Sequence, residues 1–103
     1  MLKKQTVRSR EVVKVTFTVP QEELPQDVEV ETLYVVGEFN DWDPAAHPLR
    51  ERKDGRFSTT VSLQSGRIYR FKYLVEAKYW ENDSAADAYI QNAFGTEDSI
   101  VKV

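Results

Sequence analysis

The chain has 103 residues, of which 41% are hydrophobic and 30% are charged, and its formal net charge is −3. This length suits one domain around one core, and this composition is that of an ordinary soluble globular domain rather than a disordered or membrane-spanning chain. The absence of cysteine excludes disulfides and thiolate chemistry, and the negative charge argues against broad nucleic-acid binding.

The N-terminal residues are basic and contain no apolar segment typical of a signal peptide. No apolar run in the chain approaches the roughly 20 residues of a membrane helix. We therefore expect a cytoplasmic protein that does not bind membranes. We predict a flexible basic arm over residues 1–11 and a single domain over residues 12–103.

Hydrophobic residues alternate with polar ones in the first half of the domain, which indicates half-buried strands. The alternation is clear in Val12–Val19 and ends at Pro20. After an acidic connection, residues 32–39 are rich in β-formers and predict a more buried strand. Residues 40–48 then form a polar stretch that is typical of turns.

An Asp-Gly pair predicts a hairpin between residues 49–52 and residues 56–63, because glycine accepts the positive φ that such turns require. Residues 67–76 follow with an aromatic face that predicts the core side, so that Lys72 points outward.

A tight turn near Ala77 is expected to lead into a short strand at residues 78–81, and residues 99–103 alternate well enough to be the last strand. Residues 82–98 read as a long polar loop with room for one helical turn at 83–89. About seven short strands with turns between them predict an all-β, antiparallel, immunoglobulin-like sandwich.

Candidates for catalysis or metal binding are weak. The single histidine, His47, lies in a turn. The chain has enough carboxylates to offer candidates for glycoside hydrolysis or calcium binding, namely Glu38, Asp41, Asp43, Asp83 and Asp87. Their number is the only support, and no segment matches a calcium-binding loop. No glycine-rich phosphate loop is present. We therefore expect no catalytic residue, no metal and no cofactor.

Three aromatic residues occur in polar surroundings, where a large ring has little core to join. Trp42 lies in a turn, and Tyr79 and Trp80 lie in a hairpin. An exposed aromatic ring with polar neighbours can stack on the C–H face of a sugar. Consecutive strand residues face opposite ways, so one of Tyr79 and Trp80 is expected to be exposed and the other buried.

Three segments together resemble one family. They are GEFNDW at residues 37–42, the outward Lys72, and FGTEDSI at residues 94–100. They are similar to the glycogen-binding domain of the AMP-activated protein kinase β-subunit and to the early-set N-terminal modules of isoamylases and glycogen branching enzymes. The resemblance runs from about Val12 to the C-terminus and implies a carbohydrate-binding β-sandwich.

The resemblance also implies roles for individual residues. Trp42 matches the first stacking tryptophan, and Lys72 matches a lysine that bonds sugar hydroxyls. The second stacking position falls on Tyr79 or Trp80, of which we favour Trp80. Phe94 corresponds to a protruding leucine of the family, and Asp98 corresponds to its sugar-bonding asparagine. Glu76-Ala77 replaces the Asp-Gly turn that the family usually has before the second aromatic residue.

The leading hypothesis is a non-catalytic module that binds an α-1,4-linked glucan such as glycogen or a maltooligosaccharide. Because the relatives usually continue into a catalytic or assembly segment and this chain ends at its last strand, we expect a stand-alone targeting or regulatory unit that works in trans with a glycogen-metabolising enzyme. The alternative is a protein–protein interaction module that lacks a working glucan site, with the candidate residues in structural roles. A small hydrolase is the third hypothesis.

Overall fold

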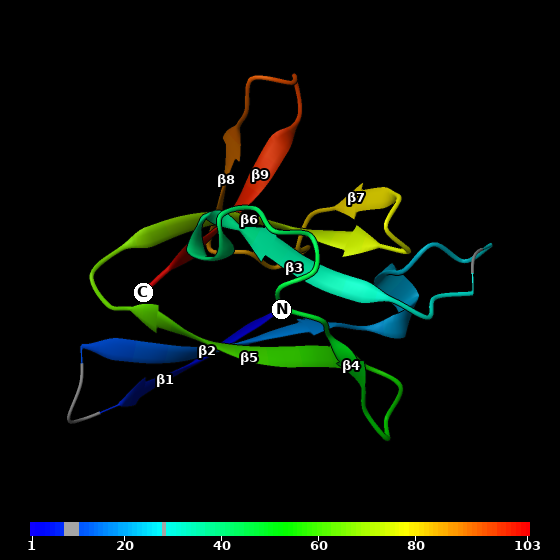
Figure 1. Ribbon diagram of the computed structural model, residues 1–103, viewed down its shortest axis with the longest axis horizontal. Helices are drawn as coiled ribbons and strands as arrows, with labels where there is room; N and C mark the ends of the chain where they lie inside the picture. Colours follow the sequence, from blue (N-terminus) through cyan, green and yellow to red (C-terminus); the bar gives the residue numbers. More distant parts are fainter. Residues whose placement is uncertain (8–10, 28) are drawn as a thin grey trace.

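The computed structural model describes residues 1–7, 11–27 and 29–103, which form two antiparallel sheets stacked as two layers (Figure 1). One sheet has the strand order β1-β2-β5-β4, with β1 at Leu2–Val7, β2 at Val12–Val19, β4 at Arg50–Glu51 and β5 at Phe57–Gln64. The predicted all-β sandwich is therefore confirmed.

The second sheet has the order β3-β6-β9-β8, and β7 pairs with the C-terminal end of β6. Its strands are β3 at Leu33–Gly37, β6 at Ile68–Val75, β7 at Tyr79–Glu81, β8 at Ala88–Gln91 and β9 at Glu97–Lys102. Two single 3-10 turns complete the described structure, η1 at Gln21–Glu23 and η2 at Glu38–Asn40. No helix in this part of the chain is long and apolar enough to cross a membrane.

The core lies between the two sheets and follows from the alternation of each strand. Val15 and Phe17 from β2 and Phe71 and Tyr73 from β6 are fully or almost fully buried in one cluster. The rings of Phe17 and Phe71 meet edge to face with centroids 5.0 Å apart, a favoured aromatic arrangement. The aromatic face of β6 is thus the core face, as predicted.

The opposite face of the second sheet also contains buried apolar side chains. Val36, Leu74 and Ile100 are buried but lie outside the core cluster, because their side chains point away from the first sheet. In the register of the sheet, Val36 is paired with Lys72 and Leu74 with Trp80. Polar and aromatic side chains therefore lie beside buried apolar ones on this outer face.

The N-terminal segment differs from the arm that we predicted for residues 1–11. Leu2–Val7 forms β1, which runs antiparallel to β2 from the Leu2↔Phe17 pair onward. Leu2 packs against the core, and Lys4 Nζ contacts Asp87 Oδ2 at 2.6 Å. The pairing occupies the backbone hydrogen-bonding groups along the edge of β2. Residues 8–10 of the predicted arm lie outside the described residues.

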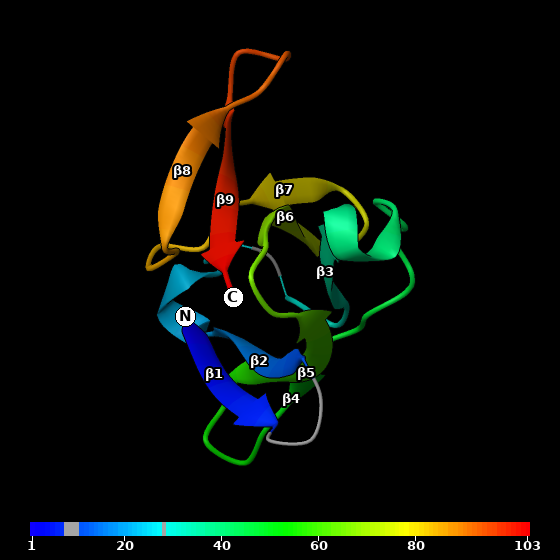
Figure 2. The same ribbon diagram turned by 90° about the vertical axis from the view of Figure 1, so that its left-hand side faces the viewer.

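The prediction of a continuous loop over residues 82–98 is wrong, as is the single helical turn at 83–89. Ala88–Gln91 forms β8 and pairs with β9 in a hairpin. Both views show that this hairpin projects away from the two layers (Figures 1 and 2). Tyr89 and Ile90 are β-formers, but four residues carry too little periodicity to reveal a strand whose pairing depends on β9.

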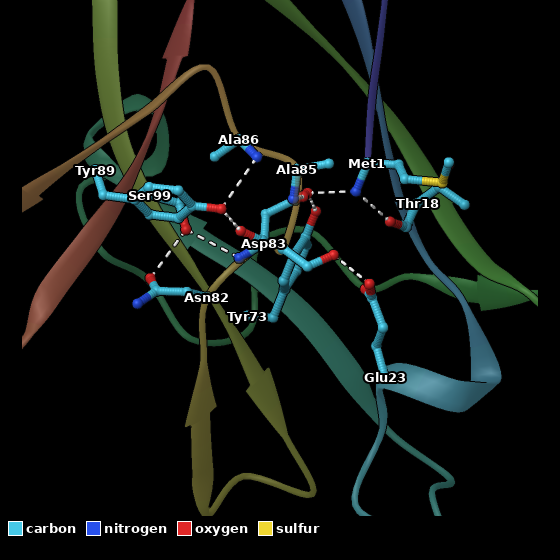
Figure 3. A network of polar contacts seen from close by, with 11 residues as sticks. Met1, Thr18, Glu23, Tyr73, Asn82, Asp83, Ala85, Ala86, Tyr89 and Ser99 are labelled. Carbon is cyan, nitrogen blue, oxygen red and sulfur yellow. Dashed lines mark hydrogen bonds and ion pairs between the residues drawn. The ribbon is translucent and has the colours of Figure 1, made fainter.

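Asp83 fastens the connection between β7 and β8 to the rest of the protein (Figure 3). Its Oδ2 accepts hydrogen bonds of 2.6 Å from the Tyr73 hydroxyl and from the Met1 amino group. Its N–H donates to Ser99 Oγ at 2.9 Å, and its carbonyl accepts from the Tyr89 hydroxyl. A buried carboxylate needs such partners. This network sets the base from which the β8–β9 hairpin rises.

Candidate functional site

A groove of about 660 Å³ opens on the outer face of the second sheet, a volume in the range of small-ligand sites. Segments that are far apart in the chain form it: the turn after η2, strands β6 and β7, and the β8–β9 hairpin. The residues that line the groove are Trp42, Lys72, Trp80, Asn92, Phe94, Thr96 and Asp98.

Asn40 builds the turn that holds Trp42 at one side of the groove. Its Oδ1 accepts the Gly37 N–H at 3.0 Å, and its Nδ2 donates to the Val35 carbonyl at 3.1 Å and to His47 Nδ1 at 2.9 Å. Trp42 itself has a φ of 57° and donates its N–H to the Gly37 carbonyl at 2.8 Å. The asparagine thus bonds local backbone, yet the indole beside it stays 40% exposed in the groove.

Lys72 and Asp98 form the polar floor of the groove. Asp98 is only 6% exposed. Its Oδ1 lies 4.0 Å from Lys72 Nζ, and its Oδ2 lies 3.7 Å from Arg70 Nη1. Two cations therefore compensate one nearly buried carboxylate. Lys72 Nζ also donates to Thr96 Oγ1 at 3.3 Å, so this lysine is part of a network and not a freely solvated strand residue.

Trp80 and Tyr79 take opposite sides of β7, as their alternation requires. Trp80 is 51% exposed and lines the groove. Tyr79 packs against the core cluster, and the Lys78 ammonium lies 5.4 Å from the centre of its ring. The structure brings five of the six predicted residues together in the groove and leaves Tyr79 out.

Phe94 stands at the end of the β8–β9 hairpin, where its ring is 90% exposed. Asn92 and Thr96 flank it and also line the groove, although we did not predict them from the sequence. Both fell in the segment read as a loop. The one signal in the sequence that could have identified Asn92 is the tendency of asparagine to bond the backbone two residues further on. Asn92 Oδ1 accepts the Phe94 N–H in this way, at 2.9 Å.

Three of the other candidate groups have local structural contacts. His47 Nδ1 accepts from Asn40, Glu38 Oε1 accepts the Arg70 N–H at 2.7 Å, and Asp43 Oδ1 accepts the Ala45 N–H at 2.9 Å. Within residues 1–7, 11–27 and 29–103, no three His, Cys, Asp or Glu side chains are grouped to hold a metal ion.

Asp87 binds partners away from the groove. Its Oδ2 accepts from Lys4 Nζ at 2.6 Å and from the Lys102 N–H at 2.7 Å. Partial burial acts to raise the pKa of this carboxyl, but the hydrogen bonds from Lys102 and Lys4 outweigh it and lower the pKa.

Comparison with known proteins bears on the same region. The family model described as the glycogen recognition site of AMP-activated protein kinase matches residues 26–103. The match contains every residue that lines the groove and excludes β1 and β2. A comparison with curated protein sequences found no match.

Proposed function

Because the chain belongs to the family of the glycogen recognition site of AMP-activated protein kinase, we propose that it binds an α-1,4-linked glucan, such as glycogen or a maltooligosaccharide, in the groove. We further propose that it acts by binding alone and catalyses no reaction.

The convergence of Trp42 and Trp80 carries this proposal. The two indoles come from segments that are far apart in the sequence and line one groove while both remain partly exposed. The exposure of an apolar ring to water costs free energy. Stacking the ring on the C–H face of a glucose unit removes this cost. Two such rings on one groove suit a ligand with several sugar units.

Hydroxyl groups at the edges of the sugar rings need polar partners, and the floor supplies them. Lys72 donates hydrogen bonds, and the Asp98 carboxylate accepts them. The hydrogen bond from Lys72 Nζ to Thr96 Oγ1 and the one from Asn92 to Asp98 Oδ1 keep the positions of both groups defined. An open groove leaves much of a glucan solvated, so we expect weak to moderate affinity.

Native affinity electrophoresis tests the proposal. We expect the wild type to be retarded in gels that contain glycogen and not in gels that contain dextran, an α-1,6-linked glucan. Trp42→Ala is expected to remove most of the retardation. Ile68→Ala is the matched control, because Ile68 is 63% exposed and lies outside the groove. Equal mobility of the wild type in all gels would reject glucan binding.

A binding module of this kind serves as a targeting or regulatory unit when it holds an enzyme of glycogen metabolism close to its substrate. We propose this role for the chain. The test is whether such an enzyme, mixed with the chain, sediments with glycogen in larger amount than when it is mixed with the Trp42→Ala variant. The same amount with both would reject the targeting role while leaving glucan binding intact.

A further inference from the structure

We propose that Asn92 is a positioning residue that leaves the Thr96 hydroxyl as a hydrogen-bond donor and the Asp98 carboxylate as an acceptor in the groove. This inference rests on the proposed glucan binding and goes beyond it, because it assigns the hydrogen-bonding direction that a ligand hydroxyl must satisfy.

The orientation of the Asn92 amide is set by the backbone of the β8–β9 connection. Its Oδ1 accepts the N–H of Phe94 at 2.9 Å and the N–H of Thr96 at 3.2 Å. A backbone N–H can only donate, so the oxygen of the amide must face these two groups and the nitrogen must face away. Asn92 therefore presents a donor, and not an acceptor, to the side chains beside it.

Both protons of the Asn92 amide nitrogen have partners. Nδ2 lies 2.8 Å from Thr96 Oγ1 and 2.9 Å from Asp98 Oδ1. The Thr96 oxygen also accepts from Lys72 Nζ at 3.3 Å. An amide nitrogen and an ammonium group are donors only, so both lone pairs of the Thr96 hydroxyl are occupied.

The hydrogen-bonding groups that Thr96 and Asp98 keep free for a ligand follow from these contacts. The Thr96 hydroxyl keeps one proton, and no acceptor for it occurs among the residues that the structure describes, so Thr96 can only donate to a ligand. Asp98 Oδ1 is engaged by Asn92, while Oδ2 has Arg70 Nη1 at 3.7 Å, beyond hydrogen-bonding distance. Asp98 therefore offers an acceptor to a ligand hydroxyl.

Asn92→Asp is the variant that isolates this role. Aspartate keeps the oxygen that accepts the Phe94 and Thr96 N–H groups, so the hairpin connection is retained. The substitution removes both amide protons and gives the Thr96 hydroxyl proton an acceptor inside the protein. It also places a second carboxylate beside Asp98. We expect the affinity for maltoheptaose, measured by isothermal titration calorimetry, to fall about tenfold or more.

The exchange variant Asn92→Asp/Asp98→Asn separates positioning from a structural role. It restores an amide–carboxylate pair but reverses its direction, so the denaturation midpoint is expected to recover while the affinity stays low. Recovery of both together, or wild-type affinity of Asn92→Asp, would overturn the proposal. Asn82→Asp is the matched control, because Asn82 bonds Glu97 and Ser99 outside the groove, and we expect it to keep wild-type affinity.

A measurement without ligand distinguishes failure of this inference from failure of glucan binding. If the wild type binds no glucan, the proposed function fails, and the side-chain amide resonances of Asn92 in NMR spectra still decide the hydrogen-bond assignment. Thr96→Val is expected to shift one of the two proton signals and Asp98→Ala the other. Unshifted signals in both variants would overturn the assignment.

Discussion

The Tyr73 hydroxyl lies 2.6 Å from Asp83 Oδ2, and both side chains are buried beside the base of the β8–β9 hairpin. Burial raises the pKa of Tyr73 well above its ordinary value, and the charge and hydrogen bond of Asp83 raise it further. The folded protein therefore holds this proton more tightly than the unfolded chain does.

Tyr73→Phe removes the hydroxyl and leaves Asp83 without one of its donors. We expect the free energy of unfolding at neutral pH to fall by about 1–3 kcal/mol. In the wild type, the stabilisation from the raised pKa is present below the unfolded value of about 10 and is lost as the pH rises through the folded pKa. Urea denaturation at about pH 8 and about pH 11, below and above the unfolded tyrosine pKa, measures both effects. The variant should lose less stability than the wild type at the higher pH. An equal alkaline loss would contradict the assignment.

Ala77→Gly is expected to stabilise the protein. Glu76 and Ala77 connect β6 to β7 with φ values of 53° and 55°, a left-handed pair that alanine adopts at a cost and glycine adopts freely. We expect a gain of about 1 kcal/mol in the free energy of unfolding. Ala45→Gly, in an exposed turn without positive φ, is the control and should bring no gain.

Gly37→Ala is expected to destabilise the turn that carries Trp42. A Cβ atom at Gly37 would lie 2.4 Å from the Arg70 carbonyl oxygen and 2.8 Å from Phe71 Cβ, so the backbone of β6 would have to move. We expect a loss of about 1–3 kcal/mol or more by chemical denaturation. Gly66→Ala, with a φ of 77° and nothing within 4 Å, should cost less. The reverse order would contradict the steric explanation.

Trp80→Ala and Tyr79→Ala are expected to separate binding from stability. Trp80 is exposed in the groove, so its loss should weaken glucan binding about tenfold through lost stacking. Tyr79 packs against the core, so its loss should lower the denaturation midpoint more than the affinity. Titration calorimetry and thermal denaturation of both variants check this. A larger loss of affinity in Tyr79→Ala would move the stacking role to Tyr79.

Phe94→Ala is expected to change the free energy of unfolding by less than about 0.5 kcal/mol, because the ring contributes little buried area. Affinity for maltoheptaose should fall, since the ring lines the groove and has no core to stabilise. Phe94→Leu keeps an apolar tip and should retain most of the affinity. Unchanged affinity in Phe94→Ala would remove this residue from the proposed site.

The alternation of single strands was enough to predict the sandwich, the core face of β6 and the outward position of Lys72. These properties are local, because neighbouring residues of a strand always face opposite ways. The turn after β3 was also readable, since its polar residues mark it without knowledge of any partner strand.

The tertiary structure alone decided which side of β7 faces the groove, that Leu2–Val7 and Ala88–Gln91 pair as strands, and that Asn92 reaches Asp98. Each of these depends on strand pairing between segments of the chain. Alternation shows which residues share a face, but the identity of the neighbour across that face is set only when the sheets assemble.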